Sequence, residues 1–171
     1  MARVHWLTGD EERAWRAYRR MRTLLDLQLA RDMARDSGLS EADYDVLSTL
    51  TEDGGPPWRA TDLAARLLWS TSRLAHQVGR MERRGLVARE ASEVDKRGAL
   101  ISLTDEGWRT LRAAARKHVR SVRANFIDLM EPAELEVLAT IASKVVEEIT
   151  PKVARTGPMR SAGGAAAHHE K

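Results

Sequence analysis

Apolar residues recur at helical spacing in six segments of the chain, and each segment starts or stops at residue types that favour helix ends. The first helix is expected over residues 8–37, because Thr8 and Glu11 form a capping box and Gly38 follows. A second helix begins after Ser40. It ends before the stretch DGGPPW, since paired glycines and prolines do not continue a helix.

The middle of the chain predicts two short helices followed by a β-hairpin. Thr61 is the expected cap of the first short helix, and Ser70 caps the second, which ends at Gly85. The runs LVARE and ALISL alternate apolar and polar residues around a charged tip, as two paired strands do. Two helices joined by a tight turn and followed by a hairpin form a winged helix-turn-helix lobe, which we place at residues 40–103.

Two long helices follow, one capped by Thr104 and one that starts at Pro132. Their apolar stripes are too long for the small lobe to cover, so we predict that residues 8–37 and 104–150 form a helical dimerisation platform. The fold class is therefore mainly α with a small β-hairpin wing, and residues 151–171 are expected to be a disordered tail. The stripe predicted for the first of these helices consists of Trp108, Leu111, Ala115, Val119, Val122, Phe126 and Leu129.

Composition narrows the function classes. The 171 residues include no cysteine, which excludes thiol nucleophiles, cysteine-ligated zinc and disulfides. The N-terminal sequence lacks the apolar core of a signal peptide and no later run suits a membrane span, so we expect a cytoplasmic protein without membrane contact. No catalytic motif appears at a workable spacing, so we predict no enzyme activity, no cofactor and no metal; His168 and His169 are interpreted as part of the tail.

Positive charge is concentrated in the middle of the chain. The formal net charge is +3, whereas residues 59–98 alone carry nine basic and five acidic side chains. Such a segment favours a polyanionic partner, which in the cytosol is usually nucleic acid, and the winged helix-turn-helix makes double-stranded DNA the expected partner. The alternative, which charge alone leaves open, is that this stretch is a solvated surface.

The second short helix is the predicted DNA-recognition helix. If Leu74, Val78 and Met81 face the core, the polar residues between them face outward. Arginine suits guanine, glutamine suits adenine, and serine or histidine suits several bases. Ser70 is expected to contact phosphate in addition to capping the helix. The predicted DNA-binding set on this helix is Ser70, Thr71, Ser72, Arg73, His76, Gln77 and Arg80.

The hairpin tip provides a second predicted DNA contact. Arg97 is expected to enter a narrow minor groove, with Asp95 beside it as a salt-bridge partner. Lys96 lacks the planar guanidinium of arginine, so we assign it to phosphate rather than to bases.

The stretches LSEADYDVLSTL and DLAARLLWSTSRLAHQVGRMERRGLVAREASEVDKRGALISLTDEG resemble the MarR family of bacterial transcription factors. The most specific elements are ERRGLV, the DKRG tip and LTDEG. The resemblance implies a homodimer that binds pseudo-palindromic operators, often as a repressor released by a phenolic or anionic small molecule. This sequence departs from the family pattern at Arg73 and His76. The operator preference of a relative therefore cannot be assigned to this chain.

An effector site is predicted between the platform and the lobe, where the family usually places one. Trp15, Tyr18, Arg22 and His118 are the candidate ligand-binding residues, with Arg22 or His118 holding a carboxylate. The alternative is that these aromatic residues belong to the core.

A second function class also stays open, which is a winged-helix module that binds only protein. Salt dependence distinguishes the two classes, because DNA binding would weaken steeply as salt rises, whereas a hydrophobic protein interface would not.

Overall fold

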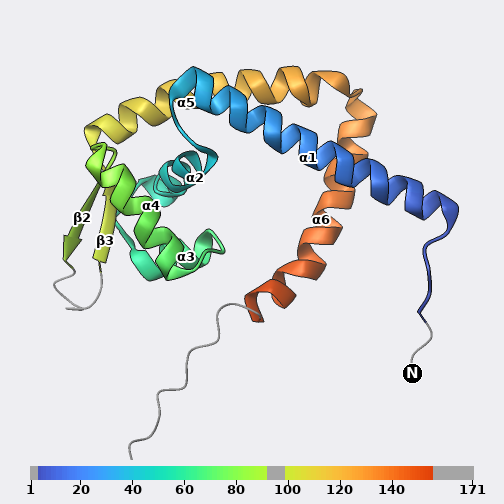
Figure 1. The fold of residues 1–171 in the computed structure, drawn as a ribbon, viewed down its shortest axis with the longest axis horizontal. Helices are drawn as coiled ribbons and strands as arrows, with labels where there is room; N and C mark the ends of the chain where they lie inside the picture. The colour runs from blue at the N-terminus through green and yellow to red at the C-terminus, as the bar shows by residue number, and fades with distance from the viewer. Residues whose placement is uncertain (1–3, 92–98, 156–171) are drawn as a thin grey trace, which may run out of the picture. The chain divides into compact units, whose positions relative to one another are not determined.

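The computed structural model describes residues 4–91 and 99–155, and the chain divides into two compact units, Met1–Glu131 and Pro132–Lys171. The order of helices and hairpin predicted from the sequence is confirmed, and the fold is a mainly helical winged helix-turn-helix (Figure 1). The α-helices in these ranges are α1 (Gly9–Ser37), α2 (Glu41–Thr49), α3 (Ala60–Arg66), α4 (Thr71–Arg83), α5 (Asp105–Asn125) and α6 (Pro132–Arg155). Short 3₁₀ turns lie at Glu52–Gly54 and Ile127–Leu129.

Local cap chemistry fixes most helix ends. The Thr8 amide donates to the Glu11 carboxylate at 2.7 Å, and the Ser40 amide donates to Asp43 at 2.9 Å, so both N-termini carry capping boxes. Ser70 and Thr104 accept the expected backbone hydrogen bonds at the starts of α4 and α5. Gly38 ends α1 in the left-handed conformation, with φ of 67°. These sequence predictions are confirmed.

The predicted cap at Thr61 is wrong. Arg59 occupies the N-cap position of α3, and the Thr61 hydroxyl, inside the first turn, donates to Asp62 at 3.2 Å. The reason lies in the sheet, because Trp58–Arg59 form a short strand, β1, that pairs with strand β3 (Ala99–Leu103). The extended backbone therefore ends at Arg59, and the helix starts with the next residue.

The wing is a three-stranded antiparallel sheet in the order β1-β3-β2. Strand β2 (Val87–Ala91) pairs with β3 (Ala99–Leu103) from Val87 opposite Leu103 to Ala91 opposite Ala99. These two strands are the predicted hairpin. The two-residue strand β1 is too short for an alternating pattern to reveal, and it was not predicted.

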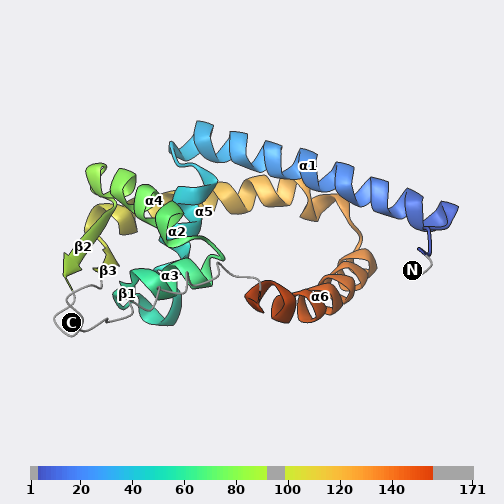
Figure 2. The ribbon, with the colours of Figure 1, turned by 60° about the horizontal axis from the view of Figure 1, so that its bottom comes forward.

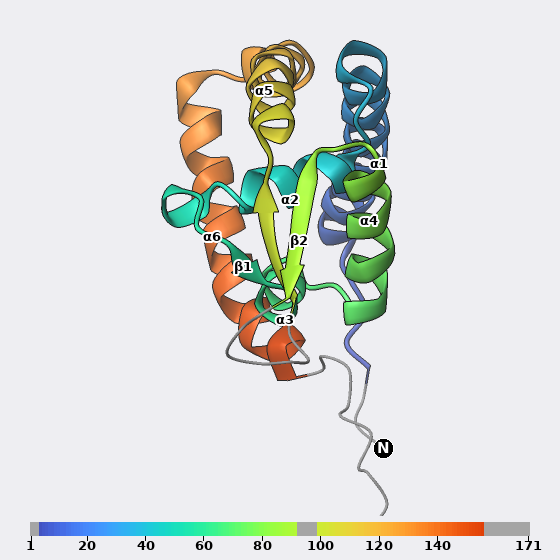
Figure 3. The ribbon, with the colours of Figure 1, turned by 90° about the vertical axis from the view of Figure 1, so that its left-hand side faces the viewer.

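The hydrophobic core lies inside the lobe, between α2, α3, α4, the sheet and the first half of α5 (Figure 3). Helix α4, the predicted recognition helix, contributes Leu74, Val78 and Met81, each no more than 1% exposed, as predicted. Fixing α4 on three of its turns makes it a rigid support for whatever its other face contacts. The other buried hydrophobic residues are Met33, Leu39, Val46, Leu47, Leu50, Leu63, Ala64, Leu86, Val87, Ile101, Leu111 and Ala114.

Helix α1 packs against α5 (Figure 2). The buried Asp32 carboxylate on α1 accepts hydrogen bonds from Ser121 at 2.6 Å and from Asn125 at 3.2 Å, both on α5. Hydrogen bonds from Ser121 and Gln28 hold the pKa of Asp32 below its ordinary value. This polar link orients the two long helices relative to each other.

The two long C-terminal helices differ from the sequence prediction at their ends. Helix α5 stops at Asn125, because Phe126 leaves the helical region with φ of −144°, so Phe126 and Leu129 lie in the following turn instead of on the α5 stripe. Helix α6, which forms the described part of the second unit, begins at Pro132 as predicted and continues to Arg155, past the expected start of the tail at Pro151.

The turn between α3 and α4 contains an unfavourable backbone conformation. Leu68 has φ of 55°, and its side chain is 72% exposed, so its Cβ is strained while its side chain gains little from packing. We expect Leu68→Gly to raise the free energy of unfolding by about 0.5–1 kcal/mol, measured by denaturant unfolding. Leu68→Ala is the control, since it removes the exposed side chain but keeps Cβ; an equal gain in that variant would contradict the backbone explanation.

Candidate nucleic-acid interface

One face of α4 is buried and the opposite face is exposed and polar. Thr71, Ser72, Arg73, His76 and Arg80 are exposed, as the sequence predicts for residues that face DNA. Ser70, also exposed, caps the helix by accepting the Arg73 amide at 3.1 Å. The first turn of α4 thus presents hydroxyls, free amides and a guanidinium together, which is a suitable surface for phosphate and base edges.

Gln77 is a correction to the predicted set. Its side chain is 2% exposed, and its Nε2 donates to Asp43 on α2 at 2.6 Å. The position lies at the edge of the apolar stripe, and Asp43 supplies the partner that allows a polar side chain to be buried there. Gln77 therefore cannot contact adenine in this conformation.

Arg73 is held by an aromatic neighbour. Its guanidinium lies 4.0 Å from the centroid of the Trp69 ring, a cation–π stack between the turn before α4 and its first turn. Trp69 is itself half-buried against the core. The stack restrains Arg73 on the exposed face; sequence analysis missed it, although the four-residue spacing from an aromatic residue was visible.

The predicted wing residues Asp95, Lys96 and Arg97 lie outside the described residues, so their roles stay predictions. The base of the wing is well anchored. The Thr104 hydroxyl donates to the Gly85 carbonyl at 2.6 Å, and its amide donates to the Leu86 carbonyl at 3.3 Å. These bonds connect the end of the hairpin to the end of α4, so the base of the wing is fixed in position relative to α4.

The four predicted effector residues do not form one site. Trp15 and Tyr18 stack with ring centroids 5.7 Å apart, and Arg22 lies 6.0 Å from the Tyr18 centroid, all on α1. The first two are 50% and 46% exposed, so they are not core residues in this chain. His118 lies elsewhere, with its ring centroid 4.8 Å from that of Tyr44.

His118 lines a cavity of about 310 Å³ between α1, α2 and α5 that Trp15, Tyr18 and Arg22 do not reach. Partial burial raises the pKa of Glu41 in its wall, and the charges of Asp26 and Asp45 raise it further. Negative walls disfavour the anionic ligand that the sequence suggested. The lining residues are Asp26, Leu29, Met33, Glu41, Tyr44, Asp45 and His118.

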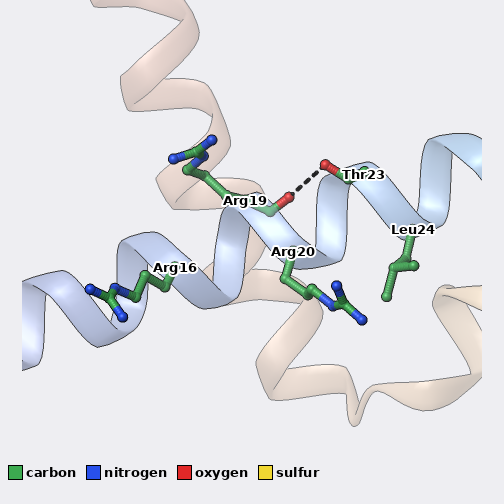
Figure 4. Close-up of a pocket in the computed structure, with 5 residues that line it drawn as sticks. All are labelled: Arg16, Arg19, Arg20, Thr23 and Leu24. Carbon is green, nitrogen blue, oxygen red and sulfur yellow. Dashed lines mark hydrogen bonds between the residues drawn. The ribbon is translucent and has the colours of Figure 1, made fainter.

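A cluster of arginines on α1 was not singled out from the sequence. Figure 4 shows Arg16, Arg19 and Arg20 around a pocket whose remaining walls are Thr23 and Leu24. The Thr23 hydroxyl donates to the Arg19 carbonyl at 3.0 Å. Residues 13–25 contain five arginines and no acidic residue, so this part of α1 presents a positive surface beside exposed apolar residues.

Two further observations concern metals and membranes. Among the residues that the structure describes, no group of three or more histidine, aspartate or glutamate side chains is placed to hold a metal ion. Across the same ranges, 4–91 and 99–155, none of the helices combines the length and the apolar character that a bilayer crossing requires.

Comparison with known proteins identifies relatives of the whole fold. The model of the MarR family matches residues 37–98. The transcriptional regulator HosA of Escherichia coli is 31% identical over 131 residues, which is 77% of this chain and 95% of HosA. The regulator PecS of Dickeya dadantii is 30% identical over 95 residues, so the chain spans only 55% of that protein. The crystal structure of Sco3205, a MarR family transcriptional regulator from Streptomyces coelicolor in complex with DNA, is 37% identical with a TM-score of 0.84 and covers 92% of this chain and 99% of its own.

Proposed function

Because the chain belongs to the MarR family of transcriptional regulators, we propose that it binds a pseudo-palindromic operator as a homodimer and represses transcription by blocking polymerase. The observation that carries this proposal is α4, which is anchored by buried apolar residues on one face and presents Ser72, Arg73, His76 and Arg80 on the other. The likeness to a regulator solved in complex with DNA supports the same assignment.

In this proposal α4 lies in the major groove. An α-helix fits that groove, and an arginine there donates two hydrogen bonds to guanine O6 and N7. Arg73 and Arg80 are the proposed base-contacting residues, while Ser70 and Thr71 contact phosphate. The wing residues Lys96 and Arg97 add phosphate and minor-groove contacts, with Asp95 as the partner of Arg97.

Unpaired apolar surface supports the homodimer. On α1, Trp15, Tyr18, Met21, Leu24 and Leu27 are 40–50% exposed, and α6 leaves a row of valine and isoleucine residues exposed as well. An apolar groove of about 530 Å³ lies between α1 and the turn after α5. The arginine-rich segment 13–25 is opposite in charge to residues 132–150, which carry four glutamates and one lysine. In the proposed homodimer these apolar surfaces are covered by a second copy of the chain.

We also propose that a small molecule releases the protein from DNA. The proposed binding site of this molecule is the cavity beside His118. That cavity lies between α2 of the lobe, α5, and α1, which carries part of the proposed dimer surface. The two lobes of the dimer must have one particular spacing to bind the operator. A ligand that binds more tightly to a different spacing shifts the protein away from the DNA-binding state. We further propose that the chain has no enzyme activity and acts in the cytoplasm.

Selection of bound fragments from random double-stranded DNA tests the proposed function. We expect an enriched inverted repeat whose half-sites are about one helical turn apart, and an affinity that falls steeply as salt rises. The other candidate function, a winged-helix module that binds only protein, predicts no enriched sequence and little salt dependence. Transcription from a promoter that carries the selected site, with and without the protein, then separates a repressor from an activator.

Arg73 is the residue in α4 whose replacement tests base recognition. Arg73→Ala should relax base preference within a half-site at a cost of roughly 1–3 kcal/mol, because a bidentate contact to guanine is lost. Competition binding against a set of single-base-pair variants of the selected site measures this. Arg83→Ala is a charge-matched control on the same helix, since Arg83 donates to the Gly79 carbonyl at its end. Equal losses of discrimination in the two variants would remove Arg73 from the proposed role.

A further inference from the structure

The buried Gln77 joins two charged residues that lie on different helices. Its Nε2 donates to Asp43 Oδ1 on α2 at 2.6 Å, and its Oε1 accepts a hydrogen bond from Arg80 Nη2 one turn further along α4. Gln77 is 2% exposed, whereas Arg80 is exposed. The amide therefore connects an interior carboxylate to a guanidinium on the proposed DNA-binding face.

The Asp43 carboxylate is itself fixed from several directions. Its Oδ2 accepts the Ser40 amide and hydroxyl, each at 2.9 Å, and Arg84 Nη1 at 2.8 Å. Arg84 also donates from Nη2 to the Gly38 carbonyl at 3.1 Å, at the end of α1. Burial raises the pKa of Asp43, but the hydrogen bonds from Ser40 and Arg84 together hold it below its ordinary value, so the group stays charged at neutral pH.

The two neighbours of Gln77 impose one orientation on its amide. A carboxylate only accepts hydrogen bonds and a guanidinium only donates them, so the NH₂ group must face Asp43 and the oxygen must face Arg80. The reverse orientation would place oxygen against oxygen and NH₂ against guanidinium. The direction of the Arg80 side chain is consequently set from inside the protein.

We propose that Asp43 and Gln77 are positioning residues for DNA recognition, which hold Arg80 in the conformation that contacts a base without touching DNA themselves. This inference rests on the proposed function. A free arginine on a helix surface samples many rotamers and loses that freedom on binding, so prior restraint favours one contact geometry over others. Arg83 is the matched comparison on α4, because its side chain donates to the Gly79 carbonyl of its own helix.

The test uses Gln77→Met, which keeps the length and apolar contacts of the side chain but removes both hydrogen bonds. Discrimination is measured as the Kd for a single-base-pair variant of the operator divided by the Kd for the selected operator. At the base pairs where Arg80→Ala relaxes discrimination, we expect Gln77→Met to lower that ratio roughly tenfold. In an Arg80→Ala background, Gln77→Met should cause no further loss at those positions. Arg83→Ala should leave them unchanged.

A second measurement works on the free protein. The Arg80 Nε–Hε signal in NMR relaxation should report a restrained side chain in the wild type and a mobile one in Gln77→Met, whereas the Arg83 signal should be the same in both proteins, because Arg83 donates to the Gly79 carbonyl of its own helix. If Gln77→Met does not fold, Asp43→Asn takes its place, because it keeps the size of the residue and removes the charge that orders the amide.

The outcomes separate the inference from the function on which it rests. A wild type that selects no DNA sequence would overturn the proposed function and this inference together. A wild type that selects a sequence, with equal losses for Gln77→Met at every base pair or losses additive with those of Arg80→Ala, would overturn the inference alone. A mobile Arg80 side chain in the free wild type would overturn it as well.

Discussion

Gly107→Ala is expected to lower the free energy of unfolding by about 3 kcal/mol, the largest stability effect we predict for a single methyl group in this chain. A Cβ at this position would lie 2.0 Å from the Leu86 carbonyl oxygen and 3.0 Å from Leu103 Cδ2. The Leu86 carbonyl cannot retreat easily, because it accepts the Thr104 amide at 3.3 Å. To relieve the clash between the new Cβ and this carbonyl, the start of α5 would have to move away from the base of the wing.

The same substitution at Gly79 is the control, and it should have the opposite sign. Gly79 lies inside α4, and a Cβ there would meet no atom within 4 Å. Gly79→Ala should therefore stabilise the protein by roughly 0.5–1 kcal/mol, since alanine favours helix. Denaturant unfolding of both variants at one fixed protein concentration measures these changes, because the stability of the proposed homodimer would depend on concentration. A loss at Gly107 no larger than 1 kcal/mol would show that the carbonyl contact is easily relaxed.

Local chemistry explains why most of the fold was predictable. Thr8, Ser40, Ser70 and Thr104 each cap a helix through residues three positions away, so the signal is complete within four residues of sequence. Thr61 looks like the same signal but is not a cap. The start of α3 is set by the pairing of Trp58–Arg59 with Leu100 and Ile101 in β3, some forty residues later, and no local pattern reports that contact.

The error at Gln77 has a related cause. The inward positions Leu74, Val78 and Met81 lie one residue or one turn away from it, so periodicity places Gln77 at the edge of the buried face, and only its polar character suggested exposure. Its partner Asp43 lies 34 residues earlier, where it also serves as a capping-box residue. A sequence shows a polar residue at the edge of a stripe, but it does not show the distant partner that makes burial favourable.

The four predicted effector residues are not brought together within one chain, for a geometric reason. Trp15 lies fourteen residues before Leu29, which lines the cavity beside His118, and an α-helix rises about 1.5 Å per residue. The two positions are thus about 20 Å apart along α1. The prediction rested on residue type, whereas the α1 residues that line the cavity, Asp26, Leu29 and Met33, lie towards the C-terminal end of that helix.

Ile141→Lys combined with Val145→Lys is expected to convert the proposed homodimer to monomers and to weaken operator binding by at least roughly a hundredfold. Val137, Ile141, Val145 and Ile149 follow each other at four-residue spacing on α6, and all are 46–59% exposed. Burying lysine ammonium groups in an apolar interface is costly, and the arginine-rich segment 13–25 of a second copy would repel them. Losing the dimer leaves each lobe to bind its half-site alone.

The matched control is Thr140→Lys with Ser143→Lys, which adds the same charge to α6 but on the face opposite the apolar row. Any general gain in DNA affinity from two extra lysines is common to both variants, so the difference between them isolates the interface. Analytical ultracentrifugation gives the oligomeric state, and titration of the selected operator gives the affinity. A variant carrying lysines at 141 and 145 that still sediments as a dimer would show that this face of α6 lies outside the dimer interface. A monomer that binds the full operator as tightly as the control would instead show that dimerisation contributes nothing to recognition.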